Sequence, residues 1–372
     1  MGARLPALHS MKFRLLSLAL ALLCWMPPAW SQTVGFINPG RANEPYWLGV
    51  SEAMQAAARS LGVKLEIQYA ERDPARALQL GREIAARAQR PDYVILVNEK
   101  GTLVENARVL GAAGIKTFAA FSGLLPQERA RWAPRKGLPQ LLGSLEPRAE
   151  DAGYLTAKAL IRQALADAPN GDRPQLLAIG GDRSTPVSIQ RNEGLRRALA
   201  EHPQVELVQQ SFADWRRDLA AETMAGMLAR HRQARRLWTG SDLMAFGAMD
   251  AIEAAGQQVA RDWHISSINT SNEAMKAVID GRLKALAGGH FLAGAWSLVM
   301  VYDYHHGHDF AAEGLALERP MFMLFDRAEA QRFLARFGEG LGELDFRPYS
   351  KTFNPKLKRY RFDLAELLKA RP

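Results

Sequence analysis

The chain has 372 residues, with 48 Lys and Arg against 39 Asp and Glu, a formal net charge of +9, and one cysteine. This length suits one large domain or two of ordinary size. A nucleic-acid binder would gather its basic residues beside stacking aromatics, whereas here they are spread thinly over alanine-rich segments. We therefore expect a solvated surface and no nucleic-acid partner.

The N-terminal 31 residues have the pattern of a secretory signal peptide. Three basic residues and no acidic one open this segment, namely Arg4, Lys12 and Arg14. An apolar run over residues 15–25 and a small-x-small site ending at Ser31 follow. The run is shorter than the about 20 residues that span a bilayer, and no later run is long and apolar enough to do so. We predict cleavage after Ser31, a mature chain of net charge +6, and export to the periplasm.

The single cysteine, Cys24, lies within this predicted signal peptide. The mature chain would then contain no cysteine, which suits an oxidising compartment and a fold without disulfides. It also excludes thiol catalysis and cysteine-ligated metals in the mature protein.

From Thr33 onward, short apolar strands alternate with amphipathic helices. In the first part, strands are expected at 33–38, 64–69, 93–97 and 116–120, and helices at 47–61, 74–89 and 104–113. Strands that alternate with helices at this spacing predict a parallel sheet covered by helices on both faces.

The alternation breaks and then restarts. Residues 124–139 form a less regular stretch rich in proline, and 141–144 is expected to be a strand that leads elsewhere. Helices are then expected near 149–167, 191–201, 219–231 and 244–255, and strands at 175–179, 206–211, 236–239 and 264–268. The restart predicts a second sheet rather than one long one.

Periodicity leaves the last part ambiguous. A strand at 286–290, a helix at 294–304 and a strand at 321–324 fit the pattern. The tail from Arg327 is helical at first. Residues 346–372 form a basic and aromatic extension to which the sequence assigns no regular structure.

Several segments occur in an order and spacing that point to a known family. They are 35–37 with 43–47, 93–98, 191–195, 240–248 and 267–269. Together they resemble the ribose/galactose-type periplasmic binding proteins, whose fold is shared with the ligand domains of LacI-type repressors.

The resemblance implies an α/β fold of two Rossmann-like lobes with parallel sheets joined by a three-crossing hinge, the periplasmic binding protein type I. The crossings are expected near Ser144, Gly289 and Met321. The N-terminal lobe would combine 32–143 with about 290–320, and the C-terminal lobe 144–289 with about 321–345. Ligand would lie between the lobes, at the carboxyl ends of the strands, where open parallel sheets bind ligands in general.

The function implied is that of a monomeric periplasmic solute-binding protein. Its lobes would close around a small polar ligand, a sugar or sugar-like molecule, and deliver it to an ABC-type permease. The alternative is a ligand-sensing receptor that presents its bound state to a membrane sensor kinase or cyclase, with the C-terminal extension as a docking surface.

Enzymatic motifs are missing from the sequence. No Gly-x-Gly-x-x-Gly turn follows the first strand, and neither a glycine-rich lysine loop nor a Gly-x-Ser-x-Gly elbow occurs. His305, His306, His308 and Asp309 could ligate zinc or copper, but no second cluster accompanies them. We expect no catalysis, no cofactor and no metal site.

In the N-terminal lobe, five residues are predicted to contact the ligand. A sugar needs aromatic planes for its faces and forked polar groups for its hydroxyls. Tyr46 and Trp47 would supply the planes, unless one of them fills the core. Asn43 and Asn98 would supply amides, unless the first is a turn residue and the second a helix cap. Ser122, with Phe121, stands where ribose-type proteins often have Asp-Arg, which favours a less polar or differently shaped ligand than ribose.

The C-terminal lobe and the hinge are predicted to supply five more. Arg191 matches the family's arginine at a helix start, and its rigid fork can hold two ligand oxygens. Trp215 would stack from this lobe, and Asp242 would accept paired hydroxyls or cap a helix. Asn269 stands where sugar binders commonly carry aspartate, and His290 follows Gly289 where a hinge glutamine is common.

Overall fold

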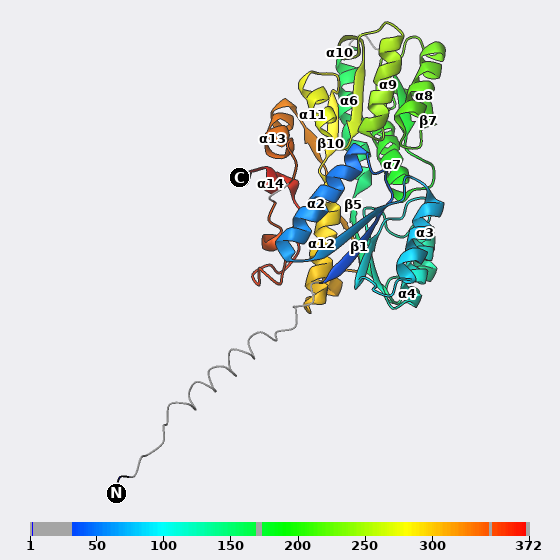
Figure 1. The fold of residues 1–372 in the computed structure, drawn as a ribbon. Helices are drawn as coiled ribbons and strands as arrows, with labels where there is room; N and C mark the ends of the chain where they lie inside the picture. The colour runs from blue at the N-terminus through cyan, green and yellow to red at the C-terminus, as the bar shows by residue number, and fades with distance from the viewer. Residues whose placement is uncertain (1, 3–31, 169–172, 342–343, 370–372) are drawn as a thin grey trace.

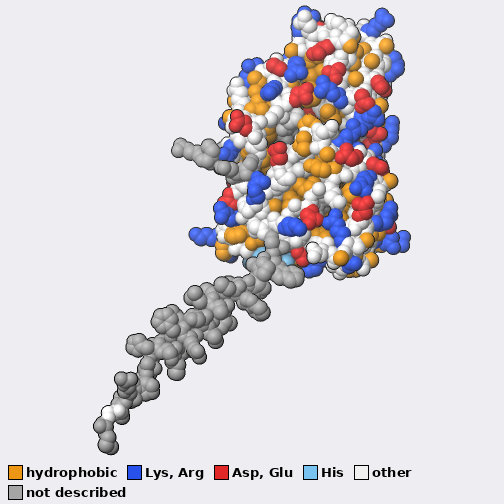
Figure 2. All heavy atoms as spheres, viewed as in Figure 1, with side chains coloured by type: hydrophobic (Ala, Val, Ile, Leu, Met, Phe, Trp, Pro, Cys, Tyr) orange, Lys and Arg blue, Asp and Glu red, His pale blue; other side chains and the backbone are white. Residues whose placement is uncertain are grey.

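A computed structural model describes residues 2, 32–168, 173–341 and 344–369 (Figure 1). The predicted signal peptide, residues 1–31, lies outside the described residues apart from Gly2. Among the described residues, no helix combines the length and the apolar character needed to cross a membrane. Basic and acidic side chains are intermixed on the face drawn in Figure 2 rather than gathered into one patch.

The N-terminal lobe is built on a six-stranded sheet in the order β11-β5-β4-β3-β1-β2, with every neighbouring pair parallel. Its strands are β1 (Thr33–Asn38), β2 (Lys64–Tyr69), β3 (Tyr93–Leu96), β4 (Lys116–Ala120), β5 (Leu141–Pro147) and β11 (Ala316–Arg319). Because successive side chains alternate between faces, Phe36 packs in one hydrophobic cluster and Ile37 in another.

Helices cover both faces of this sheet (Figure 1). On one face lie α2 (Pro45–Leu61) and α12 (Ala293–His305), and on the other α3 (Pro74–Ala85) and α4 (Leu103–Ala112). The irregular stretch that the sequence left without structure contains a short helix, α5 (Pro126–Trp132).

The C-terminal lobe repeats this plan with a sheet in the order β12-β10-β9-β8-β6-β7. Its strands are β6 (Gln175–Gly180), β7 (Glu206–Phe212), β8 (Arg236–Thr239), β9 (His264–Ile268), β10 (Ala285–Gly288) and β12 (Met323–Phe325). Only β12 is antiparallel to its neighbour. Its helices are α6 (Ala149–Ala166), α7 (Pro186–Ala200), α8 (Arg217–Arg230), α9 (Asp242–Ala254), α10 (Val259–Asp262), α11 (Asn272–Ile279) and α13 (Arg327–Phe337). The two helix-flanked sheets confirm the predicted fold class.

The chain passes between the sheets after β5, after β10 and after β11. Ser144 pairs with Ala119 and Ala316 inside the first sheet, so the boundary expected at residue 143 falls within β5. The first passage is at Arg148, four residues later than expected, because β5 continues to Pro147. The second runs through Gly289 and the 3-10 turn His290–Leu292, and the third through Met321.

The C-terminal extension folds back onto the N-terminal lobe. The end of α13 stays with the C-terminal lobe, where Asn272 Nδ2 donates to the Gly338 carbonyl at 2.9 Å. Beyond it, the Phe346 amide donates to Ser60 Oγ of α2 at 3.1 Å, and the ring of Phe362 stacks on Trp296 of α12 at 5.2 Å. The extension contains the 3-10 turn Arg347–Tyr349 and α14 (Leu364–Lys369). The chain therefore passes between the lobes a fourth time.

Candidate functional site

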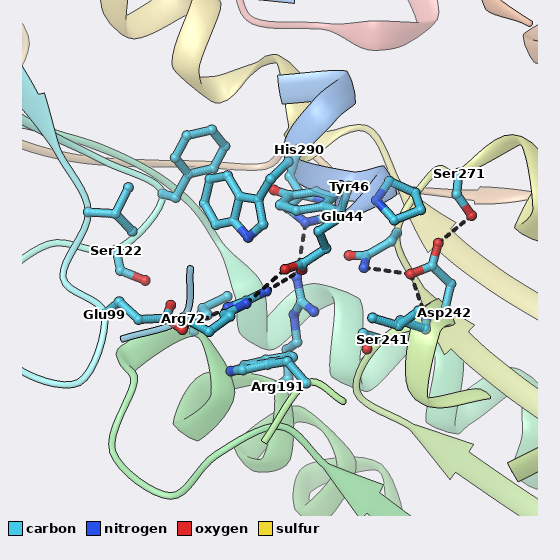
Figure 3. Close-up of a pocket in the computed structure, with 18 of the residues that line it drawn as sticks. Glu44, Tyr46, Arg72, Glu99, Ser122, Arg191, Ser241, Asp242, Ser271 and His290 are labelled. Atoms are coloured by element: carbon cyan, nitrogen blue, oxygen red, sulfur yellow. Dashed lines mark hydrogen bonds and ion pairs between the residues drawn. The ribbon is translucent and has the colours of Figure 1, made fainter. Parts of the chain in front are cut away.

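A cleft lies between the carboxyl ends of the two sheets, with walls from both lobes and from the hinge (Figure 3). Most of the side chains that the sequence singled out line it: Tyr46, Trp47, Ser122, Arg191, Trp215, Asp242, Asn269 and His290. The lobes also touch each other beside the cleft. The Lys100 amide donates to Thr185 Oγ1 at 3.4 Å, and Lys100 Nζ lies 3.7 Å from an Asp214 carboxylate oxygen. The structure is thus a closed form.

Two predicted residues lie outside this cleft. Asn43 is exposed and lines an adjoining hollow with Arg41 and Arg216. Asn98 is buried, and its amide is already used: Nδ2 donates to the Gly123 carbonyl at 2.8 Å, and Oδ1 accepts from the Leu103 amide, the first residue of α4. This is the helix-capping alternative that the sequence left open.

The aromatic residues form a connected wall. The Trp47 ring meets Phe121 edge-on at 5.3 Å and Tyr46 at 5.1 Å. Tyr46 in turn stacks on the imidazole of His290 at 4.9 Å, so one of its faces is already covered. Trp215 approaches from the C-terminal lobe and donates from Nε1 to Asp182 at 2.7 Å, which fixes the orientation of its ring.

Arg191 stands on α7 where that helix packs closely against α6. A Cβ atom on Gly153 would lie only 1.9 Å from the Arg191 carbonyl, so glycine permits this approach. The guanidinium donates to the Gly240 carbonyl at 2.6 Å and from Nη2 to His290 Nε2 at 3.0 Å. Burial lowers the pKa of Arg191 to about 10, which still leaves it charged near neutral pH.

The contact with Arg191 settles the state of His290. A guanidinium only donates, so His290 Nε2 must accept, and the ring proton therefore lies on Nδ1. Burial, with the neighbouring Arg191 charge, lowers the pKa of His290 well below its usual value, in agreement with a neutral ring. Nδ1 is then a donor, and it is buried without a partner among the described residues.

Asp242 organises the opposite wall. Its Oδ1 accepts from Asn269 Nδ2 and from the Leu243 amide, both at 2.8 Å, and Oδ2 accepts from Ser271 Oγ at 2.5 Å. Burial raises the pKa of Asp242. Nδ2 of Asn269 points to Asp242, and Oδ1 of Asn269 has no partner among the described residues.

Five buried polar atoms of the cleft lining lack a partner among the described residues. They are Trp47 Nε1, Ser122 Oγ, Arg191 Nε, Asn269 Oδ1 and His290 Nδ1. Buried polar groups are nearly always paired in folded proteins, with protein or with ordered water, so their concentration in one cleft marks it as the candidate site for a polar ligand.

Four charged cleft residues were not predicted: Glu44, Arg72, Glu99 and, at the rim, Glu273. Arg72 follows β2 and forms ion pairs with Glu44 and Glu99, and all three line the cleft. Ser122 and Asn269 were predicted because polar residues that follow strand ends line the cleft of such a fold. Arg72 and Glu99 also follow strand ends, so the same rule could have identified them. That they join into one cluster depends on the tertiary fold.

In the histidine-rich loop that was considered as a metal site, His305 and Asp309 contact other side chains. His305 Nδ1 lies 3.2 Å from the Tyr93 hydroxyl, and Asp309 pairs with Arg135 at 2.7 Å. Across the described part of the chain, no group of three or more His, Cys, Asp or Glu side chains is arranged to hold a metal ion.

Comparison with known proteins adds an independent line of evidence. A family model described as a periplasmic binding protein domain matches residues 34–308. The ribose import binding protein of Escherichia coli (strain K12) is 22% identical over 243 residues, which cover 65% of this chain and 74% of the relative.

Solved structures agree. The crystal structure of a periplasmic sugar-binding protein from Pseudomonas fluorescens has 38% identity and a TM-score of 0.82, covering 91% of this chain and all of that one. An ABC transporter solute-binding protein from Actinobacillus succinogenes 130z with bound D-allose has a TM-score of 0.69 over 81% of this chain and 99% of its own, but at 17% identity it supports the fold alone.

Proposed function

Because the chain belongs to the ribose/galactose-type, type I periplasmic binding proteins, we propose that it captures a sugar or sugar-like ligand between its lobes and delivers it to an ABC-type permease. The protein would act in the periplasm, as a monomer, after removal of residues 1–31. It would bind without catalysis.

The observation that carries the proposal is the set of unpaired polar atoms in the cleft, set among aromatic rings. A ligand with many hydroxyls both donates and accepts, so it can pair with Trp47 Nε1, Arg191 Nε and His290 Nδ1 as well as with Asn269 Oδ1. The apolar faces of such a ligand would lie against the rings of Trp47 and Trp215.

Ligand would favour closure because its partners lie on both sides of the cleft. Trp47 and Ser122 belong to the N-terminal lobe, Arg191 and Asn269 to the C-terminal lobe, and His290 to the hinge. Only the closed form offers all of them at once, and a ligand shifts a conformational equilibrium by its difference in affinity for the two states. The closed form is what a permease would recognise.

The binding step is tested by native mass spectrometry of the protein purified gently from periplasm, followed by thermal-shift measurements over a panel of sugars and polyols. We expect a retained mass matching a pentose, hexose or polyol, and a raised melting temperature with that compound. An empty protein that no member of the panel stabilises would overturn the proposal.

The delivery step needs a separate test. Uptake of the radiolabelled ligand is measured in cells with and without the gene. Loss of uptake without the gene supports delivery to a permease. Unchanged uptake, with binding intact, would overturn delivery and leave the sensor alternative.

A further inference from the structure

Glu44, Arg72 and Glu99 form a charged cluster on the N-terminal-lobe wall of the cleft (Figure 3). Arg72 donates from Nε to Glu44 Oε2 at 3.0 Å, from Nη2 to Glu44 Oε1, and from Nη1 to Glu99 Oε1 at 2.7 Å. All three side chains are mostly shielded from solvent, with exposed fractions of 9%, 15% and 7%. Removing charges from water this far is costly unless each is held by partners.

Within the cluster, only Glu99 keeps a carboxylate oxygen for another partner. Both oxygens of Glu44 accept hydrogen bonds, since Oε2 also takes the Arg41 amide at 3.3 Å. Glu99 Oε1 is held by Arg72, whereas no described residue donates to Oε2. A cleft-lining carboxylate oxygen without a donor is an acceptor for a ligand hydroxyl.

Arg72 holds Glu99 in place. The centre of its guanidinium lies 5.8 Å from the ring of Trp47 in one lobe and 5.8 Å from the ring of Trp215 in the other. Its position is therefore fixed by two carboxylates and by two aromatic rings, one from each lobe. We regard Arg72 as a positioning residue.

The charges of the cleft lining are unequal. Two guanidinium groups, Arg72 and Arg191, face three buried carboxyl groups, Glu44, Glu99 and Asp242, and the half-exposed Glu273 adds another at the rim. Burial raises the pKa of Glu99, and the neighbouring Arg72 opposes that rise and favours the carboxylate. A ligand carboxylate near Glu99 would meet like charge where little water screens it. Like charges held close together in such a site repel each other more strongly than they do in water.

From this arrangement we infer that Glu99 determines specificity: it accepts a hydrogen bond from a ligand hydroxyl and makes the cleft select uncharged sugars over the corresponding sugar acids. The inference rests on the proposed sugar-binding function. It assigns a role to a residue outside the positions that the family resemblance indicated.

Isothermal titration with matched pairs of probes tests this role. D-glucose is compared with D-glucuronate and D-galactose with D-galacturonate, for the wild type and for Glu99→Gln. For a pair whose neutral member binds, we expect the acid to bind the wild type at least tenfold more weakly. In Glu99→Gln we expect this ratio to shrink by about tenfold, because the amide removes the charge and presents a donor.

Glu146→Gln is the matched control. Glu146 is also a buried N-terminal-lobe glutamate, held by Ser144 Oγ and the Gly123 amide, but it does not line the cleft. We expect it to leave the ratio unchanged. Thermal melts of both variants establish that they are folded.

The outcomes separate the two proposals. A sugar acid that binds the wild type as tightly as its neutral partner, or a ratio that Glu99→Gln does not change, overturns the role of Glu99 while sugar binding stands. If none of the four probes binds the wild type, the comparison is made with the sugar identified by mass spectrometry and its corresponding acid. A wild type that binds no sugar or polyol of the thermal-shift panel overturns both the sugar-binding function and this inference.

Discussion

Arg191 is a buried guanidinium without a carboxylate partner among the described residues. Its visible partners are a carbonyl and a neutral imidazole, and its Nε is unpaired. Such a group is expensive to bury, so the closed cleft is incomplete until a ligand supplies an acceptor. The same reasoning applies to Asn269, whose Oδ1 has no donor within the described part of the chain.

The first prediction concerns this guanidinium. Replacing Arg191 by alanine should weaken ligand binding by about 1–3 kcal/mol, because the ligand's acceptor loses its donor inside a desolvated site. Titration calorimetry with the ligand identified by mass spectrometry measures the change. Arg197→Ala is the control, since Arg197 lies on the same helix but pairs with Glu150 at the surface. Equal affinities for wild type and Arg191→Ala would remove Arg191 from the site.

The second prediction concerns His290, which faces Arg191 and Tyr46. Its pKa is lowered in the folded protein, so the unfolded chain binds a proton more readily below about pH 6.5. The contribution of His290 to the free energy of unfolding therefore has its full value above that pH. It decreases as pH falls below it, by up to about 1.4 kcal/mol per pH unit.

Urea unfolding between pH 7 and pH 5 measures this loss, and His290→Gln should show a flatter dependence than the wild type. His308→Gln, at an exposed loop histidine, is the control and should keep the wild-type slope. If the slope of His290→Gln equals that of the wild type, the imidazole is not held neutral by burial.

At the residue scale, the sequence predicted which residues line the cleft better than it predicted which side chains pair with one another. A polar or aromatic residue after a strand end marks the cleft edge, which places Ser122, Trp215 and Asn269 on the lining. The same rule cannot tell whether a side chain is consumed by its neighbours, as Asn98 is. Nor can it join Arg72 to Glu99, because that ion pair links two loops 27 residues apart.

At the scale of elements, most of the alternating strands and helices were predicted to within a few residues because their periodicity is strong. The helix expected near 191–201 begins earlier, at Pro186, so Arg191 lies inside α7 and not at its start as predicted. The helix α12 was ambiguous since it is buried on nearly all sides and so lacks an amphipathic pattern. The predicted first lobe boundary lies inside β5, because the sequence of a short apolar strand does not show which of the two sheets the strand joins. The extension was left without structure because its aromatic residues pack against a distant helix.

The third prediction concerns the packing of α6 on α7. Gly153→Ala should destabilise the protein by about 1–3 kcal/mol, because its Cβ would clash with the Arg191 carbonyl and the backbone would have to shift. That shift displaces Arg191, so ligand binding should weaken as well. Chemical denaturation and calorimetry measure the two effects.

Gly226→Ala on α8 is the matched control. There the nearest atom to a new Cβ is the flexible end of Arg230, at 3.3 Å. Alanine should therefore be tolerated. Because alanine lowers the conformational entropy of the unfolded chain, the free energy of unfolding should rise by about 0.4–1 kcal/mol. A Gly153→Ala protein as stable as Gly226→Ala would contradict the close-packing argument.

At the scale of the whole molecule, the extension joins the lobes in addition to the three hinge passages. Its α14 reaches the hinge, where a Cβ on Gly289 would lie 3.0 Å from a methyl of Leu364. Its middle part is held by Asp303 of α12, which is fully buried. When the lobes move relative to each other, the extension must therefore move with one of them, or its contacts with Asp303 must break.

The last prediction concerns that anchor. Asp303 accepts hydrogen bonds from Ser350 Oγ, from the Lys351 and Thr352 amides, from Thr352 Oγ1 and from the Tyr360 hydroxyl, at 2.5–3.0 Å. Asp303→Ala leaves these donors unpaired, and one orphaned buried group costs about 1–3 kcal/mol, so the extension should detach before the lobes unfold. Limited trypsin digestion should then cut at the exposed Lys356, Lys358 and Arg359 faster than in wild type.

Asp280→Ala, at a surface aspartate paired with Arg282, should leave the digestion rate unchanged. An extension that stays protected in Asp303→Ala would mean that the ring stack of Phe362 on Trp296 holds it instead. If it detaches as expected, the freed hinge face should widen the range of lobe opening, because α14 would no longer lie beside Gly289. Small-angle scattering of the ligand-free variant should then give a larger radius of gyration than the wild type.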